Sequence, residues 1–203
     1  MPDRRTRIEP LERRIALSAG ALDMGFGGGL VTLPGTYANV TVPPTHPLAV
    51  QPDGKVLVAG RFFTIARYNA DGSLDPSFAQ GGVFHTTVGT VDDGAAGFDE
   101  FNAIAVAPDG SIFVAGTGTH QFNAQAVLLK LSPTGQLLML RHDDFAAAVA
   151  TEPFFADILG LAIQSNGDVV GVGTASNNFL LVRYRPDGRW TPHSALVARC
   201  CQA

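Results

Sequence analysis

Short apolar segments separated by turn residues recur along this chain at a nearly constant interval. Three closely similar phrases, LAVQPDGKVLVAG, IAVAPDGSIFVAG and LAIQSNGDVVGVG, stand at residues 48–60, 104–116 and 161–173. Their turn glycines are Gly54, Gly110 and Gly167, so the two intervals differ by a single residue. Such self-similarity predicts a tandem array in which each unit buries its apolar face against its neighbours.

Each phrase predicts a β-hairpin, because a turn tripeptide stands between two apolar segments. In the first phrase Pro52 fixes φ, Asp53 caps the turn and Gly54 takes the position that requires a positive φ. The later phrases have Pro-Asp-Gly at 108–110 and Ser-Asn-Gly at 165–167, and Asn-Gly is a strong hairpin signal. A second hairpin follows in every unit, with its turn glycine at Gly72, Gly135 and Gly188.

The strand after the first turn is apolar at consecutive positions, as in Val56-Leu57-Val58-Ala59. A half-exposed strand would alternate polar and apolar residues, so we expect neighbouring sheets to cover this strand on both faces. Four short strands per unit predict an all-β fold of tandem four-stranded antiparallel units. We interpret these units as a partial β-propeller-like array of about three blades, with a β-sandwich or a β-solenoid as the competing architectures.

A second recurrent pattern is Leu-Asp-x-x-Phe followed by glycines. Together with the hairpin phrase it is carried by Leu22-Asp23, Phe26-Gly27, residues 48–60, Ala66 to Asp75, Phe78 and Gly81-Gly82-Val83. These residues resemble the delta-60 repeat of bacterial surface and secreted proteins. Of the three units, the first matches this repeat best. The second and third units keep the turns and the apolar strands but lack the Leu-Asp-x-x-Phe segment.

The N-terminal residues 8–19, IEPLERRIALSA, resemble a short motif that begins many large exported proteins of environmental bacteria. Both resemblances imply a cell-surface or extracellular protein, and neither implies a reaction. Residues 1–20 are therefore expected to be an export-type or surface-type segment without ordered structure. Within 21–190 the three repeats are expected at about 21–83, 84–140 and 141–190, followed by a disordered C-terminal tail at 191–203.

Composition and charge narrow the classes of partner. Apolar residues make up 46% of the chain and charged residues 16%, and the formal net charge is −4. The repeats lack the Lys/Arg patch that a phosphate backbone requires, so no nucleic acid partner is expected. No apolar run approaches the roughly 20 residues that span a bilayer, so no membrane span is expected. The adjacent Cys200 and Cys201 do not provide a disulfide framework.

The histidines and glycines do not form a recognisable catalytic motif. The histidines are scattered at His46, His85, His120, His142 and His193. No closely spaced pair of them could begin a zinc site. The GFGGGL stretch at 25–30 lacks the Lys-Ser/Thr of a phosphate-binding loop, which favours a turn or bulge. No catalytic residue, metal site or cofactor is expected, and the binding residues stay unspecified.

Acidic clusters are the remaining candidates for cation binding, because carboxylates supply the oxygen ligands that hard cations prefer. They are Asp71, Asp75, Asp92-Asp93, Asp99-Glu100 and Asp143-Asp144. An EF-hand-like loop ending at Asp71-Gly72 is excluded because its first ligand would be Arg67, and a turn role is favoured for Asp71. The pairs Asp92-Asp93 and Asp99-Glu100 lie in the long 84–101 connection and are the best of these weak candidates.

The pattern favours a non-enzymatic scaffold, extracellular or on the cell surface, that mediates protein or glycan contacts. The alternative is a propeller-type hydrolase or lyase with a site at the central channel, built from equivalent positions of several blades. Those positions are mostly Ala, Val and Gly, which favours the scaffold. About three blades also leave an open edge, because propellers usually have 4–8 blades. Self-association could close the array, the tail could cover the edge, or the chain could be part of a longer array.

Overall fold

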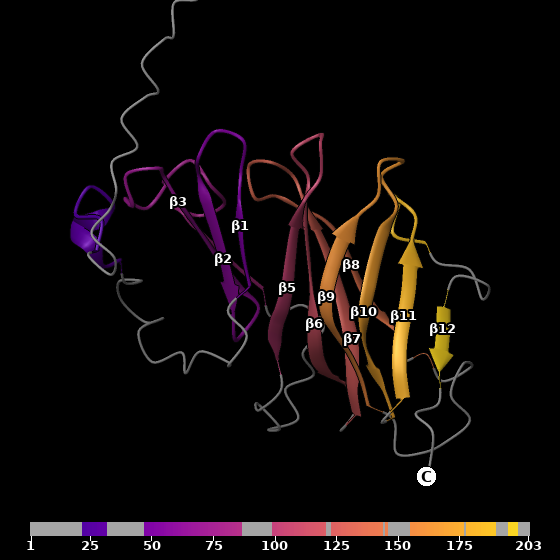
Figure 1. The fold of residues 1–203 in the computed structure, drawn as a ribbon. Coiled ribbons are helices and arrows are strands. Elements are labelled where there is room, and N and C mark those ends of the chain that lie inside the picture. The colour runs from indigo at the N-terminus through magenta and orange to yellow at the C-terminus, as the bar shows by residue number, and fades with distance from the viewer. Residues whose placement is uncertain are drawn as a thin grey trace, which may run out of the picture.

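The chain forms three four-stranded antiparallel sheets (Figure 1). The computed structural model describes residues 22–31, 47–86, 99–120, 123–143, 145, 155–176, 178–189 and 195–198. The strands are β1 (Leu48–Val50), β2 (Val56–Gly60), β3 (Thr64–Tyr68), β4 (Val83–His85), β5 (Glu100–Val106), β6 (Ile112–His120), β7 (Asn123–Leu131), β8 (Leu137–Asp143), β9 (Ala156–Ile163), β10 (Val169–Ala175), β11 (Asn178–Tyr184) and β12 (Ala195–Ala198). A short 3-10 helix, η1 (Gly27–Gly29), precedes them.

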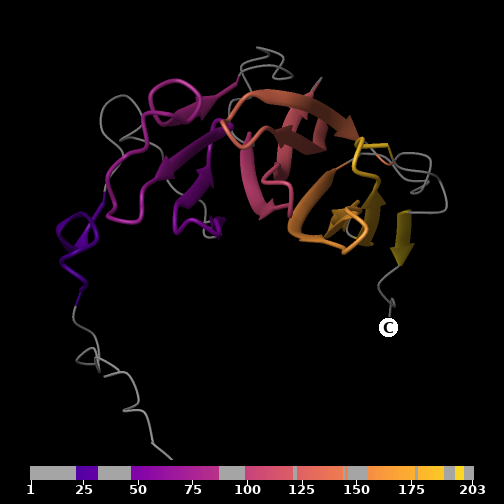
Figure 2. The same cartoon turned by 90° about the horizontal axis from the view of Figure 1, so that it is seen from above.

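Each sheet is a meander, because its strands are hydrogen-bonded in chain order. The first strands of the three sheets adjoin one another, since β5 contacts both β1 and β9. Seen from above, the sheets follow each other along an arc (Figure 2). Successive four-stranded sheets with adjoining first strands are the arrangement of propeller blades. The predicted all-β, propeller-like array is therefore confirmed.

The predicted turn glycines all have a positive φ, between 78° and 85°. In the first turn the Gly54 N–H donates to the Gln51 carbonyl oxygen (2.9 Å), and the Gln51 N–H donates to the Lys55 carbonyl oxygen (2.8 Å). Asp53 closes this turn by accepting the Lys55 N–H at Oδ1 (3.2 Å). The backbone bonds around Gly167 are the same. We call the turns at 51–55, 107–111 and 164–168 first turns, and those at 69–73, 132–136 and 185–189 second turns.

The third sheet contains its fourth strand, β12, in a segment that was expected to be a disordered tail. β12 pairs with β11 in an antiparallel register from Phe179 opposite Ala198 to Val182 opposite Ala195. It lies within 191–203, so the expected disordered tail is corrected at these four residues. The ALVA segment is short and has no turn tripeptide beside it, which explains why the pattern did not predict a strand there.

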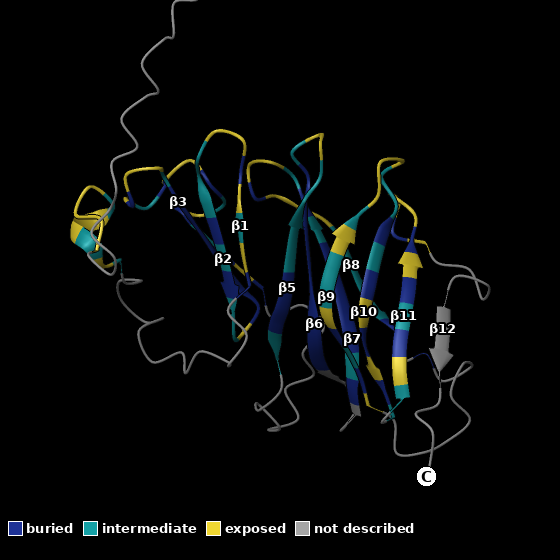
Figure 3. Ribbon diagram, viewed as in Figure 1, coloured by how far each residue is buried: buried dark blue, intermediate teal, exposed yellow. Residues whose placement is uncertain are grey.

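The hydrophobic core consists of two clusters, one at each junction between successive sheets (Figure 3). In the second sheet β6 is covered on both faces, because Ile112 and Val114 point into one cluster and Phe113 into the other, each at most 2% exposed. In the third sheet Val172 on β10 is 38% exposed. Among the described residues, burial on both faces is therefore confirmed for the middle sheet, which has a neighbouring sheet on each side.

Candidate functional site

A buried ion-pair cluster lies where the first sheet meets the second. Arg67, on β3, is 5% exposed, and its Nε donates to Oδ2 of Asp75 at 2.8 Å. Lys55 Nζ donates to the same oxygen at 2.9 Å. Arg67 Nη1 also donates to the carbonyl oxygen of Pro133 in the second sheet, and the guanidinium stands 4.7 Å from the centre of the Phe78 ring. One side chain thus connects a carboxylate, an aromatic ring and the next sheet.

The Asp75 carboxylate is saturated by donors from the protein itself. Ser77 donates its backbone N–H (3.0 Å) and its hydroxyl (2.6 Å) to Oδ1, while Lys55 and Arg67 bind Oδ2. Burial alone would raise the pKa of Asp75. The hydrogen bonds and the Arg67 charge outweigh burial, so the pKa is lowered far below that of an ordinary aspartate. This candidate oxygen ligand therefore serves as an ion-pair partner inside the junction.

The cation that crosses to the next sheet recurs one unit later. Lys130 on β7 is the counterpart of Arg67, because each lies two residues before a second turn. Lys130 Nζ donates to the carbonyl oxygen of Pro186 at 3.2 Å and stands 5.2 Å from the centre of the Phe113 ring. Pro133 and Pro186 occupy the same position of their second turns. The first two sheets thus each send a cation to the second turn of the next sheet.

The Leu-Asp-x-x-Phe segment of the first unit packs on the second sheet. Phe78 is fully buried, and its N–H donates to the Asp75 carbonyl oxygen at 3.1 Å. The Ala79 N–H donates to the Thr134 carbonyl oxygen at 2.8 Å. A Cβ on Gly135 would lie 2.7 Å from the Phe78 ring, so glycine is required at this close approach. The segment therefore docks on the second turn of the following sheet.

Residues 22–31 dock on the first sheet in the same way. The Phe26 N–H donates to the Asp23 carbonyl oxygen at 3.1 Å, and the Gly27 N–H donates to the Asp71 carbonyl oxygen at 2.8 Å. These bonds repeat those of the segment around Phe78. The GFGGGL stretch is thus part of a docking segment on a second turn. This agrees with its interpretation as turn or bulge glycines.

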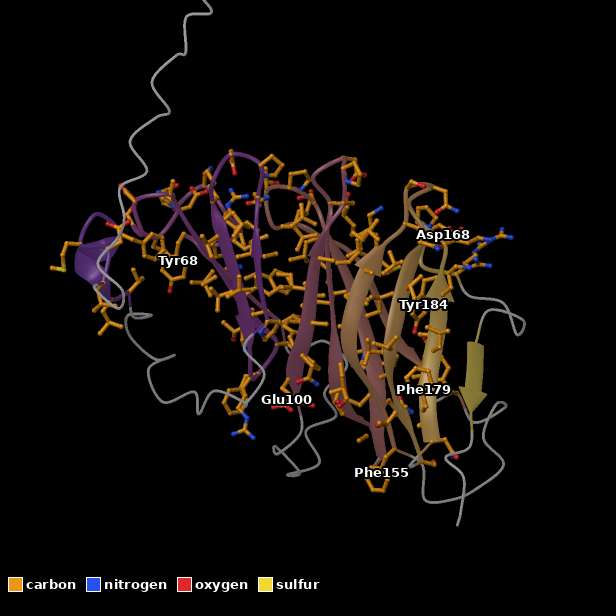
Figure 4. The ribbon with its side chains drawn as sticks, viewed as in Figure 1. Tyr68, Glu100, Phe155, Asp168, Phe179 and Tyr184 are labelled. Atoms are coloured by element: carbon orange, nitrogen blue, oxygen red, sulfur yellow. The ribbon has the colours of Figure 1, made fainter. Side chains whose placement is uncertain are left out.

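A second buried polar cluster joins the second and third sheets. The Tyr184 hydroxyl, on β11, donates to Oδ2 of Asp143 at 3.0 Å, and Arg141 Nη2 donates to Oδ1 of Asp143 at 2.9 Å. Burial and the Asp143 charge both raise the pKa of Tyr184, so its hydroxyl stays protonated and able to donate. The hydrogen bond to Asp143 also raises the pKa of Arg141. Figure 4 shows Tyr184 on the third sheet.

The first strands carry polar residues that contact neighbouring sheets. Asn102 on β5 donates from Nδ2 to Oδ1 of Asp157 on β9 at 3.0 Å. Glu100, labelled in Figure 4, has its Oε2 3.6 Å from Nε of Arg61. These contacts link the first strands to each other and to the loop after β2. They are side-chain pairs between neighbouring sheets.

The other acidic candidates lie apart from one another where the structure describes them. Asp71 is a turn residue, since its Oδ1 accepts the Ser73 N–H (2.9 Å) and hydroxyl (2.6 Å), and these bonds lower its pKa. Asp92, Asp93 and Asp144 lie outside the described residues. Among the described residues, no three His, Cys, Asp or Glu side chains gather in a group that could hold a metal ion.

The histidines are equally dispersed. His85 ends β4, His120 ends β6 and His142 lies on β8, whereas His46 and His193 lie outside the described residues. The described part of the chain also contains no helix with the length and apolar character needed for a membrane crossing.

Two groups of junction residues were not found from the sequence. The first group had a signal that could have been used, because each repeat has a cation two residues before its second turn, at Arg67, Lys130 and Arg183. The bond from Tyr184 to Asp143 had no such signal, because the two residues belong to different units. The carbonyl oxygens that receive the cations are backbone atoms and leave no trace in the side-chain pattern.

Three successive blades with adjoining first strands define a partial β-propeller. A family model described as a domain of unknown function (DUF5122) beta-propeller matches residues 51–78. This stretch runs from the first turn of the first sheet through β2 and β3 to the buried Phe78. The fold and this match together make the chain a β-propeller repeat protein.

Two solved structures are similar to this chain in overall outline. A protein of unknown function from Bacteroides caccae has 15% identity and a TM-score of 0.45, with 75% of this chain and 45% of that chain covered. Virginiamycin B lyase from Staphylococcus aureus has 16% identity and a TM-score of 0.41, with 81% and 44% covered. The chain thus spans less than half the length of each. No curated protein matches it.

Proposed function

We propose that this chain is a non-enzymatic repeat scaffold, extracellular or displayed on the cell surface, that binds protein or glycan partners. The observation that carries the proposal is the use of its buried charges. Asp75 and Asp143 each hold a junction between sheets, where cations and hydroxyls of the chain surround them. In a propeller enzyme, the reactive side chains of several blades would converge on the channel instead.

A strained turn at one rim presents an aromatic side chain to solvent. Phe62 and Phe63 have φ values of 53° and 48°, which cost about 1–3 kcal/mol each for residues with side chains. Phe63 is fully buried beside Phe101, with ring centres 5.0 Å apart, whereas Phe62 is 46% exposed. The Phe62 N–H donates to the Asp99 carbonyl oxygen at 2.7 Å. The turn therefore anchors one phenyl ring in the core and exposes the other.

A second exposed phenylalanine lies at the same rim. Phe155 is 51% exposed just before β9 (Figure 4). β5 and β9 begin at the same edge, because Asn102 is bonded to Asp157, and the bond from Phe62 to residue 99 places Phe62 beside the start of β5. Exposed aromatic side chains are typical of surfaces that bind other molecules. We call Phe62 and Phe155 the aromatic rim.

The test is binding of the purified full chain to immobilised bacterial polysaccharides, host glycans and extracellular matrix proteins. We expect saturable binding to a member of this panel, with a Kd raised at least about tenfold by the double variant Phe62→Ala/Phe155→Ala. Leu138→Ala is the matched control, because Leu138 is 54% exposed but lies on the outermost strand β8. Equal binding by both variants, or none to the panel, would contradict the proposed surface.

Two further measurements test whether the protein is non-enzymatic and whether it lies at the cell surface. Turnover of a bound glycan, followed by mass spectrometry of the products, would contradict a non-enzymatic role. Protease accessibility of the chain on intact cells of the native host tests its display at the surface. We expect cleavage in intact cells, and protection until lysis would contradict this location.

A further inference from the structure

The two faces of a sheet have different parts in a junction. At the first junction, Leu57 and Ile65 belong to the face of the first sheet that points toward the next one, which we call the trailing face. They pack in one cluster with Ile104 and Val106 on β5 of the second sheet. We call the face that receives such a neighbour the leading face. The first junction thus joins a trailing face to a leading face.

The second junction repeats this pairing with the corresponding residues. Phe113 and Leu128 on the trailing face of the second sheet pack with Leu161 and Ile163 on the leading face of the third. The strand registers confirm the correspondence, because Val106 pairs with Ile112 as Ile163 pairs with Val169. The same interface therefore occurs twice within one chain.

The third sheet carries the same trailing face at the surface. Val172 stands where Ala59 and Ala115 stand in the other sheets, five residues after the first-turn glycine. Those alanines are 2% and 0% exposed, whereas Val172 is 38% exposed. Phe179 is 50% exposed, while its counterpart Phe63 is fully buried. Apolar side chains that a neighbouring sheet covers in the first unit thus face solvent in the third.

The crossing cation is also present in the third sheet. Arg183 lies two residues before the second turn, as Arg67 and Lys130 do. Its side chain is 55% exposed, and its Nε lies 3.9 Å from Oδ2 of Asp168 in the same sheet. In the two internal junctions this cation donates to a carbonyl oxygen of the following sheet.

The complementary surface is the leading face of the first sheet. Leu48 and Val50 on β1 are 60% and 63% exposed, whereas their counterparts Ile104 and Val106 pack in the first cluster. Ala70 holds the position in the second turn at which the other units place the proline that receives the cation. The first and third sheets lie at opposite ends of the arc (Figure 2).

We propose that a second copy of this chain docks head to tail, with the leading face of its first sheet on the trailing face of the third sheet. Val172 and Phe179 then pack against Leu48 and Val50 of the other copy, and the Arg183 guanidinium donates to the other copy's Ala70 carbonyl oxygen. A second copy fits because both faces belong to this chain, and the corresponding faces of its neighbouring sheets already pair twice within it. Apolar burial drives the contact, and the cation sets its register.

Residues 22–31 add a second element to this fit. The third unit has no Leu-Asp-x-x-Phe segment after Gly188, and the internal junction at Thr134 receives such a segment from the preceding unit. On the first sheet, the segment at 22–31 already occupies the corresponding place through Gly27 and Asp71. The leading face of one copy thus carries the segment that the trailing face of the other lacks. Such a contact joins two different surfaces and is heterologous.

The first experiment is the mass of the full chain by sedimentation velocity over a range of concentrations. We expect association to twice the mass of one chain or to a higher multiple. Leu48→Asp on the leading face and Val172→Asp on the trailing face should each abolish it. Both side chains are exposed within the chain, so circular dichroism should show that each variant stays folded. Leu138→Asp, on the outermost strand, is the control and should associate like the unmodified chain.

The decisive experiment is to mix the two single variants in equal amounts. Leu48→Asp keeps an intact trailing face and Val172→Asp keeps an intact leading face, so the mixture should recover a particle of two chains. Arg183→Glu should also weaken the association, although it leaves the apolar side chains of both faces in place. A chain that stays monomeric at its highest soluble concentration would overturn the proposal. So would a mixture without recovery, or association that survives both Asp substitutions.

Discussion

The two junctions of this molecule join successive sheets through different side chains. At the first, the buried Phe78 fills the space above Gly135 and Arg67 forms an ion pair with Asp75. At the second, the side chain of Met139 on β8 occupies the space above Gly188. The polar contact there runs from Tyr184 to Asp143 instead. The backbone scheme is the same, because in both cases the preceding unit packs on a second turn.

The comparison indicates which part of the repeat the fold requires. The Leu-Asp-x-x-Phe segment is absent from the second unit, yet the second junction forms, since Met139 and Lys130 supply an apolar contact and a cation. The second-turn glycine and the crossing cation are present at both junctions. The aromatic segment is thus one of two solutions to the same packing problem, and we expect it to be the stronger one.

The largest expected effect is that of Phe78→Ala. Removing a fully buried phenyl ring costs about 3–5 kcal/mol, and here it also removes the ring beneath Arg67. Met139→Ala at the second junction should cost about 2 kcal/mol, because Met139 is only partly buried. Urea unfolding of both variants measures the two losses. Equal losses would show that the junctions are of equal strength.

The carboxylate of the first junction should dominate the response to acid. Asp75→Asn should cost about 2–3 kcal/mol at neutral pH, because it weakens charged hydrogen bonds. The folded pKa of Asp75 lies below its unfolded value, so its contribution is fully present above about pH 4 and is lost as the pH falls.

Unfolding free energies between pH 5 and pH 2 check this prediction. The Asp75 contribution should stay constant above about pH 4 and fall below it, so the unmodified chain should lose more stability below pH 4 than Asp75→Asn, which no longer has the group that titrates. Parallel curves for the two proteins would mean that Asp75 does not carry the acid dependence.

Tyr184→Phe should weaken the second junction alone. The variant keeps the ring in the core but removes the hydroxyl that donates to Asp143, at a cost of about 1–2 kcal/mol. Tyr68→Phe is the control, because Tyr68 holds the same position in the first sheet at the end of the arc. Thermal unfolding should show the larger drop in Tm for Tyr184→Phe. A larger drop for Tyr68→Phe would show that the Tyr184 hydroxyl does not stabilise the second junction.

Local chemistry explains what could be predicted from the sequence. The turns at Gly54 and Gly110 were predictable because Pro, Asp and Gly each meet a backbone requirement within a few residues. Their regular recurrence then predicted the number of sheets and the burial between them. The Asn-Gly turn at Gly167 was also predicted, and it makes the same bonds as the Asp-Gly turns.

The contacts across the junctions could not be predicted in the same way. Tyr184 and Asp143 belong to different units, and nothing in the local pattern of either residue indicates the other. The substitution of Met139 for an aromatic anchor depends on three-dimensional position, since Met139 lies on a strand while Phe78 lies in a connection. The strand at Ala195–Ala198 forms through pairing with β11, and its four apolar residues are too few, without a turn tripeptide beside them, to predict a strand.

The smallest expected effect isolates the packing of the first junction. Gly54→Ala and Gly135→Ala both place a side chain at a φ near +80°, which costs about 1–2 kcal/mol by itself. A Cβ at Gly54 would lie 3.3 Å from the nearest atom of Ala70, whereas one at Gly135 would lie 2.7 Å from the buried Phe78 ring. Gly135→Ala should therefore cost about 1 kcal/mol more than Gly54→Ala, because the added methyl group at position 135 is coupled to the Phe78 ring.

Combining each glycine variant with Phe78→Ala completes the test. Without the phenyl ring, the cost of Gly135→Ala should fall toward that of Gly54→Ala but stay above it, because the new Cβ would still lie 2.9 Å from the Cβ of Ala79. The cost of Gly54→Ala itself should not change when Phe78 is replaced. Urea unfolding of the six proteins gives the coupling energy as a difference of differences. If Gly135→Ala costs the same with and without Phe78, the aromatic segment does not press on the second turn. The first junction would then owe its strength to the rest of the apolar cluster and to the ion pair of Arg67 with Asp75.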